Sequence, residues 1–186
     1  MSPKFAEFIL CKVLGWTRTE PLIPEKKSVV LAAPHTSIWD FAIGYLYYRS
    51  LGGHLKVMIK KEAFVFPPVG WFLRSVGGFP IDRKNSGELV RSLIEEMNAC
   101  EGEFHLVICP EGTRKPVRKW KMGYHTIATQ TGLPLYLSHW DFKTKTVGRG
   151  QRFELSSDAR GDTDRIQQIY EGMHLTGLHP ENYITH

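Results

Sequence analysis

Hydrophobic residues along this chain form two kinds of pattern: short continuous runs and longer stretches with helical spacing. Continuous apolar runs typical of buried strands occur at 28–33 and 104–109, and the second is the clearest in the chain. Helical spacing is clearest over about 85–100, where apolar residues recur on one face. Glu88 stands three residues after Asn85, the spacing of a capping box, which places the start of this helix.

Weaker patterns complete the series of predicted elements. Further strands are predicted at 55–59, 79–81, 133–138, 144–147 and 152–155. Further helices are predicted at 5–14, 38–51, 71–75, 123–131 and 163–174, and 67–70 is predicted as a turn. Because strands and helices alternate over most of the chain, residues 1–186 are expected to form a single α/β domain with a mostly parallel sheet flanked by helices.

Composition agrees with a folded domain and excludes other classes. Apolar residues make up 42% of the 186 residues and charged residues 23%, so a disordered chain is not expected. The most apolar stretch, 28–48, is interrupted by Pro34, His35 and Asp40, so no membrane-spanning segment is expected. Glu7 interrupts the apolar run that a signal peptide would need.

Cysteine content and charge bear on the compartment and the partner. The three cysteines show no metal-ligand spacing and are odd in number, which predicts a reducing, cytosolic setting without disulfides. The chain carries 24 Lys and Arg against 19 Asp and Glu, a formal charge of +5. An anionic partner is therefore favoured, and charge alone leaves phosphate, a membrane surface and nucleic acid open.

The first polar cluster, 34–40, stands where a predicted strand gives way to a predicted helix. Ligands of open α/β sheets collect at the carboxyl ends of strands, so a catalytic histidine is expected there. His35 suits proton transfer near neutral pH, and Asp40 can hold one ring nitrogen while the other acts as the base. Spacing alone leaves a plain alternative open, in which Asp40 caps the helix and His35 is a packed residue.

Two further polar clusters also follow predicted strands, at 82–84 and 110–115. The arginines in them can grip phosphate oxygens with two parallel hydrogen bonds. Gly112 allows close backbone approach, and Thr113 supplies a hydroxyl. Because the carboxyl ends of parallel strands share one edge of a sheet, the three clusters together predict an anion-binding site with a histidine base.

Taken in order, these motifs resemble the glycerolipid acyltransferase family, the group that includes the 1-acylglycerol-3-phosphate acyltransferases. The first family motif, a His, four residues and an Asp, is matched by His35 and Asp40. The second is matched by 79–83, the third by Pro-Glu-Gly-Thr-Arg at 110–114, and the fourth looks like 132–135. Many family members have Asn where this chain has a proline before the histidine. The motif-bearing core covers about residues 29–140, and the resemblance implies a glycerol-3-phosphate acyltransferase-like fold.

The resemblance implies transfer of a fatty acyl group from a thioester of coenzyme A or acyl carrier protein to a lysophospholipid hydroxyl. The expected acceptor is 1-acylglycerol-3-phosphate, which would give phosphatidate. His35 would be the general base and Asp40 would orient it, while Arg83 and Arg114 would grip the acceptor phosphate. The residues expected to bind the acceptor are Arg83, Glu111, Gly112, Thr113 and Arg114. The thioester is a co-substrate and no cofactor is expected; the remaining histidines show no shared ligand spacing, so no metal is expected either.

Several alternatives stay open at this point. The donor can be coenzyme A or acyl carrier protein, and the same fold and dyad can serve another acceptor, such as an amino-lipid. A non-catalytic lipid- or anion-binding module would keep the fold without turnover, and the intact pair of His35 and Asp40 argues against it. A nucleic-acid partner would rest only on the high pI and the basic run at 114–121, and none is expected.

Residues 1–18 contain the remaining partner prediction. Their short helix at 5–14 can pack on the domain or lie in a membrane interface. Peripheral binding through this segment at the cytoplasmic face of a membrane is expected, aided by the net positive charge. Trp39, Trp71 and Trp140 are expected in the core or in a pocket wall.

Overall fold

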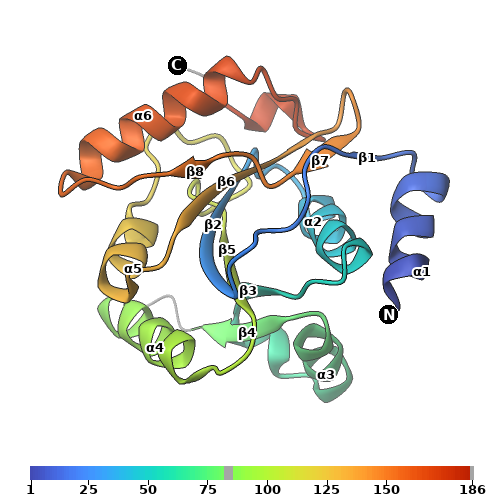
Figure 1. Ribbon diagram of the computed structural model, residues 1–186, viewed down its shortest axis with the longest axis horizontal. Helices are drawn as coiled ribbons and strands as arrows, with labels where there is room; N and C mark the ends of the chain where they lie inside the picture. The colour runs from blue at the N-terminus through green and yellow to red at the C-terminus, as the bar shows by residue number, and fades with distance from the viewer. Residues whose placement is uncertain (82–85, 185–186) are drawn as a thin grey trace.

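A computed structural model describes residues 1–81 and 86–184, and its centre is an eight-stranded sheet (Figure 1). The strands run in the order β1-β7-β6-β2-β5-β3-β4, and β8 pairs with β6 outside this path. Their bounds are β1 Thr17–Arg18, β2 Lys27–Ala33, β3 Leu55–Lys60, β4 Gly78–Ile81, β5 Phe104–Ile108, β6 Leu135–Asp141, β7 Thr146–Gly148 and β8 Arg152–Phe153.

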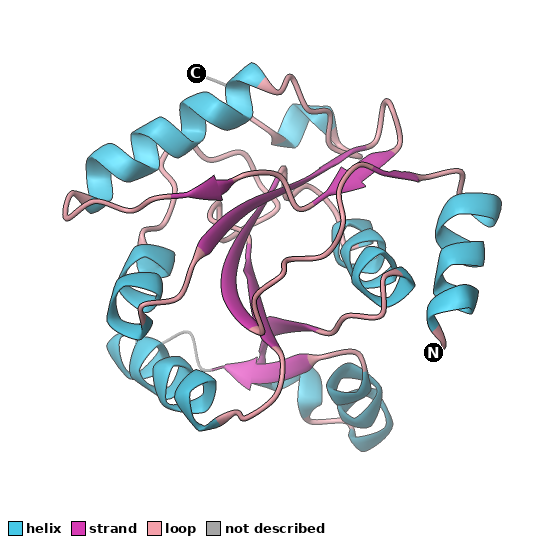
Figure 2. Cartoon of the chain, viewed as in Figure 1, coloured by secondary structure: helices cyan, strands magenta, loops and turns pink. Residues whose placement is uncertain are grey.

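The helices connect these strands or flank the sheet (Figure 2). Their bounds are α1 Pro3–Glu7, the π-helical turn η1 Phe8–Val13, α2 Trp39–Ser50, the 3-10 turn η2 Lys61–Phe64, α3 Pro67–Ser75, α4 Ser86–Ala99, α5 Gly123–Thr131, α6 Ala159–Gly172 and the 3-10 turn η3 Pro180–Asn182. Strands and helices alternate as the sequence predicts, and the α/β fold is confirmed.

The sheet is mostly parallel, which is also confirmed. Strand β2 lies at its centre and pairs in parallel with β5 on one side and β6 on the other. Strand β3 pairs in parallel with β5 and β4, and only β7 and β8 run antiparallel to β6. Every residue of β2 after Lys27 is buried, which explains its continuous apolar run.

The two larger hydrophobic cores cover the two faces of the sheet (Figure 1). One core holds side chains of α4, α5 and α6, with Leu31 of β2 among them. The other holds side chains of α1, η1 and α2, with Ala32 of β2 among them. Neighbouring residues of β2 thus face opposite cores, as alternation along a strand requires.

Several predicted boundaries are wrong, each for a local reason. Helix α6 begins four residues before its predicted start because the Asp158 side chain accepts hydrogen bonds from the backbone of Arg160 and Gly161. Residues 67–70, predicted as a turn, form the first turn of α3, where proline is tolerated because the first helical N–H groups have no partner within the helix. The predicted cap Asn85 lies outside the described residues.

Candidate active site

The loop after β2 carries the first predicted cluster. The buried strand ends at Ala33, a cis peptide bond joins it to Pro34, and α2 begins four residues after His35. The indole Nε1 of Trp140 donates a hydrogen bond of 2.5 Å to the Pro34 carbonyl, which ties the loop to β6. His35 therefore lies at the carboxyl end of the central strand, where the sequence predicts it.

His35 and Asp40 meet in this loop. His35 Nδ1 lies 3.0 Å from Asp40 Oδ2, and the same oxygen accepts the backbone N–H groups of Thr36 at 2.7 Å and Ser37 at 2.8 Å. The Asp40 side chain is 1% exposed, whereas that of His35 is 25% exposed. An ionised carboxylate can only accept, so we assign the proton to Nδ1, which leaves Nε2 with a lone pair. The predicted contact between the two side chains is confirmed.

Glu111 joins the third motif to this loop. It follows β5, is buried, and its Oε1 accepts the backbone N–H of His35 at 2.8 Å. Burial raises the pKa of Glu111 from the ordinary 4.5 to about 7. The family resemblance implies a place for Glu111 in the acceptor site. Its contact with the His35 backbone is one that spacing along the chain does not reveal.

The loop beyond Glu111 presents cations next to a glycine. Gly112 has a φ of +67°, a conformation that residues with side chains rarely adopt, and a Cβ there would lie 2.8 Å from Lys121 Cε. The Lys121 side chain therefore lies against the third motif, although the sequence shows it only as part of the basic run at 114–121. The Thr113 hydroxyl accepts the Lys115 N–H at 3.2 Å, and Arg114 is exposed.

The C-terminal segment also reaches the His35 loop. A Cβ on Gly177 would lie 2.6 Å from the Thr36 side chain, and the His179 N–H donates to Thr36 Oγ1 at 3.3 Å. No pattern in the sequence indicates this contact, since more than a hundred residues separate the two segments. The second predicted cluster, with Arg83, lies outside the described residues.

We expect Glu111→Gln to raise the free energy of unfolding by about 1–3 kcal/mol at pH 8, and to change it less at pH 5. Because the pKa of Glu111 rises from 4.5 to about 7, the folded state binds more protons than the unfolded state between these pH values. Stability therefore falls as pH rises through this window, and the difference, 7 − 4.5 = 2.5, corresponds to about 3 kcal/mol. The neutral amide avoids this penalty, and its oxygen can still accept the His35 N–H.

Urea unfolding of both proteins at pH 5 and pH 8 measures this effect. Glu101→Gln, at an exposed position, is the matched control and should shift neither curve. Equal stability changes in Glu111→Gln at both pH values would show that the Glu111 carboxyl does not titrate in this window.

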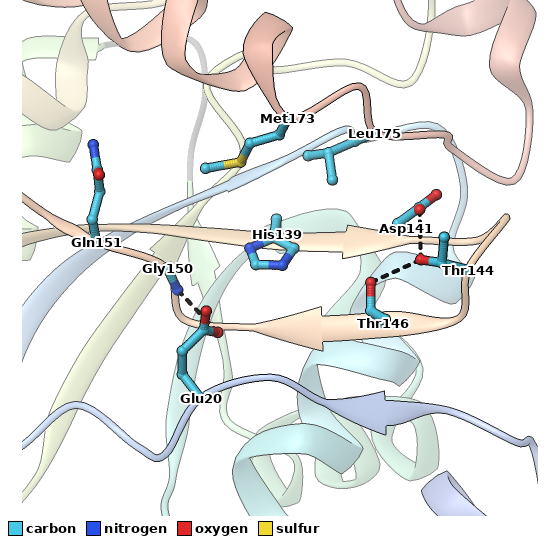
Figure 3. A pocket seen from close by; sticks show the side chains of 9 residues that line it. All are labelled: Glu20, His139, Asp141, Thr144, Thr146, Gly150, Gln151, Met173 and Leu175. Atoms are coloured by element: carbon cyan, nitrogen blue, oxygen red, sulfur yellow. Dashed lines mark hydrogen bonds between the residues drawn. The ribbon is translucent and has the colours of Figure 1, made fainter.

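A separate cavity of about 700 Å³ lies beside β6 and β7 (Figure 3). It is lined by Glu20, His139, Asp141, Thr144, Thr146, Gly150, Gln151, Met173 and Leu175. Asp141 is already held by the Thr144 hydroxyl at 2.6 Å and the Thr176 N–H at 3.0 Å. None of the described site residues lines this cavity, and no group of three metal-ligating side chains occurs among the described residues.

Comparison with known proteins gives a family and a fold. The family model described as Acyltransferase matches residues 17–136. A 1-acyl-sn-glycerol-3-phosphate acyltransferase of Streptococcus pneumoniae is 30% identical over 97 residues, covering 52% of this chain and 35% of the relative. One of Bacillus subtilis is 32% identical over 118 residues, covering 61% of this chain and 55% of the relative. The chain thus spans about half or less of these relatives' lengths.

A solved structure has the same fold. The crystal structure of the 1-acyl-sn-glycerophosphate acyltransferase PlsC from Thermotoga maritima aligns with a TM-score of 0.62, covering 92% of this chain and 78% of that one. Sequence identity is 17%, so the likeness concerns the fold alone. The matched family region, 17–136, contains both the His35 loop and the third motif.

Proposed function

This chain belongs to the acyltransferase family, and we propose that it transfers a fatty acyl group from a thioester of coenzyme A or acyl carrier protein to the free hydroxyl of a lysophospholipid. The acceptor we propose is 1-acylglycerol-3-phosphate, which appears in the names of several relatives. The product we propose is phosphatidate. The observation that carries the proposal is the contact of the buried Asp40 carboxylate with His35 Nδ1, which leaves Nε2 as a base.

The proposed reaction is a direct transfer with His35 as general base. Nε2 takes the proton of the acceptor hydroxyl while its oxygen attacks the thioester carbonyl carbon. The carbon–sulfur bond then breaks, and the thiolate leaves with the proton that His35 returns. Asp40 stabilises the imidazolium formed in between. Burial raises the pKa of the Cys109 thiol well above its usual range, which makes this cysteine a poor nucleophile and supports transfer without an acyl-enzyme.

The test is product formation by purified protein mixed with lysophosphatidate and defined acyl thioesters, followed by mass spectrometry. Phosphatidate formed from one class of donor supports the reaction and identifies that donor. Absence of product from coenzyme A and acyl carrier protein thioesters alike, with folded protein, would overturn the proposed acceptor.

Arg114 is the described residue that we propose for gripping the acceptor phosphate, with Lys121 beside it; Arg83 is proposed on the motif alone. We expect Arg114→Gln to lower kcat/KM for lysophosphatidate by about 10- to 100-fold, because a charge-assisted hydrogen bond contributes about 1.5–3 kcal/mol. The same substitution should lower kcat/KM for a phosphate-free monoacylglycerol much less. Lys115→Gln, the neighbouring exposed cation, is the control. Equal losses on both acceptors would contradict the phosphate contact.

We also propose that the chain binds a membrane peripherally, at the cytoplasmic face. Helix α1 packs on α2 through Ala6, and η1 buries Leu10, as the packing alternative requires. Phe5 and Phe8 remain more than half exposed on the other side and are free to enter a lipid interface. No helix among residues 1–81 and 86–184 has the length and apolar content to cross a bilayer.

A further inference from the structure

Helix α3 is an apolar helix whose side chains face solvent. Of its nine residues only Gly70 is buried, and Leu73 is half-buried. Trp71 is 74% exposed and Phe72 62% exposed, so the expectation that Trp71 lies in the core or a pocket wall is wrong. No residue of α3 belongs to either hydrophobic core in the described part of the chain.

The packing of α3 explains this exposure. A Cβ on Gly70 would lie 2.9 Å from the Phe64 carbonyl oxygen, so the helix approaches η2 through its one residue without a side chain. The Arg74 guanidinium covers the Phe64 ring at 5.2 Å. Helix α3 thus contacts Phe64 through Gly70 and Arg74, and Gly78 of β4 through the Leu73 backbone, while Trp71 and Phe72 stay exposed.

Five exposed apolar residues lie close together in the chain, within residues 65–72. We call this set the α3 patch, and it consists of Val65, Phe66, Val69, Trp71 and Phe72. Each of the five is exposed, with Val65 at 79%. Scattered single apolar residues are normal on a surface, whereas a contiguous cluster marks a surface that binds something.

The α3 patch follows the same edge of the sheet as the His35 loop. Through β5, Val57 of β3 stands level with Val30 of β2. Three residues further along each parallel strand, Lys60 is therefore level with Ala33, two residues before His35. The turn η2 and the α3 patch continue directly from Lys60.

The His35 loop itself exposes apolar side chains. Ile38 is 65% exposed and Trp39 53% exposed, at the start of α2. Trp39 is therefore not a core residue, while Trp140 is buried as expected. The α3 patch and the start of α2 are thus two exposed apolar segments that follow strands at the edge of the sheet that carries the candidate active site.

Charge decides which partner fits the α3 patch. Lys60, Lys61 and Arg74 flank it and are exposed, and Glu62 is the acid among them. Tryptophan and phenylalanine side chains bordered by cations are the composition of surfaces that enter the headgroup region of anionic bilayers. A second copy of the chain would instead bring the same cations against each other.

We propose that the α3 patch docks on an anionic phospholipid bilayer, with Trp71 and Phe72 inserted among the lipids and Lys60 and Arg74 at the headgroups. Docking here holds the His35 edge of the sheet toward the bilayer, and so adds a second contact to the one proposed for residues 1–18. The membrane contact itself does not depend on the acyl-transfer reaction.

Vesicle flotation tests this docking. The probes are vesicles of phosphatidylglycerol and phosphatidylcholine, beside pure phosphatidylcholine. We expect Trp71→Ala/Phe72→Ala to lower partitioning onto the anionic vesicles by about tenfold or more. Met122→Ala removes an exposed apolar side chain outside the α3 patch, just before α5, and should change partitioning much less. Phe5→Ala/Phe8→Ala measures the separate contribution of the N-terminal segment.

Tryptophan fluorescence locates the contact. Trp39 and Trp71 are exposed, whereas the other three tryptophans are buried. In a Trp39→Phe protein, brominated phosphatidylglycerol should quench the emission of Trp71, and the further change Trp71→Phe should remove that quenching.

Three results would overturn the docking. The first is that Trp71→Ala/Phe72→Ala floats with anionic vesicles as the wild type does. The second is that quenching by brominated lipid persists after Trp71→Phe. The third is that the wild type sediments as a dimer and Trp71→Ala/Phe72→Ala as a monomer. Assays with lysophosphatidate in detergent micelles separate the two proposals. If the wild-type protein binds vesicles but forms no product in micelles, the proposed reaction is contradicted and the proposed docking is not.

Discussion

His35→Ala should lower kcat for phosphatidate formation by about 10²- to 10⁴-fold, the usual contribution of a general base. The substitution removes the ring whose Nδ1 is held 3.0 Å from Asp40 and whose Nε2 we propose as the base. The backbone N–H of residue 35 still reaches Glu111, so the loop keeps its link to the third motif. Mass spectrometry of the product under single-turnover conditions measures the loss without interference from product release.

His54→Ala is the matched control for this change. His54 directly precedes β3, at the opposite edge of the sheet from the His35 loop, and its side chain is 67% exposed. Wild-type turnover in His54→Ala with loss in His35→Ala would support the assignment. Turnover that survives His35→Ala at more than about a tenth of the wild-type rate would be incompatible with His35 as the base.

Asp40→Asn should lower kcat on the order of 10³-fold while the protein stays folded. An amide oxygen at the place of Oδ2 can accept the same three hydrogen bonds, from His35 Nδ1 and the backbone of Thr36 and Ser37. The negative charge that stabilises the imidazolium is lost. The amide NH₂ takes the place of Oδ1, which has no partner among the described residues, so a stability cost of about 1–3 kcal/mol is expected.

A double-mutant cycle distinguishes this positioning role from a purely structural one. Because Asp40 acts through His35, the double variant His35→Ala/Asp40→Asn should be about as slow as His35→Ala alone. Urea unfolding of each variant measures stability separately, and Asp164→Asn on the exposed face of α6 is the control. Fully additive losses in kcat would mean that Asp40 contributes by a route other than His35.

Local patterns in the sequence predict most of the elements and the core of the site. The run at 28–33 and the run at 104–109 are strands because continuous β-branched and aliphatic residues suit a strand buried on both faces. The five-residue spacing of His35 and Asp40 brings the two side chains together because one short loop and the first turn of α2 hold both. Both features depend on residues close in the chain, which a single sequence displays.

Features that depend on distant residues escape the sequence. The bond from Glu111 to the His35 backbone joins segments 76 residues apart, and it exists because β2 and β5 are neighbours in the sheet. Lys121 lies against Gly112 because the loop after β5 folds back on itself, with the Lys121 N–H donating to the Pro110 carbonyl. Neither contact produces a periodic pattern of residues in the sequence that could predict it.

The tryptophans show the limit most clearly. Hydrophobicity alone places Trp39, Trp71 and Trp140 in the core or in a pocket wall, whereas in the structure Trp140 is buried and the other two are exposed. Whether an apolar side chain is buried depends on which elements pack over it, and α3 meets the protein through Gly70 rather than through its rings. The sequence by itself therefore determined most of the strands and helices and the His35–Asp40 pair, because these follow from short-range spacing. Only the tertiary structure decided which loops share the site and which apolar face stays open, because both are set by the order in which distant strands and helices pack.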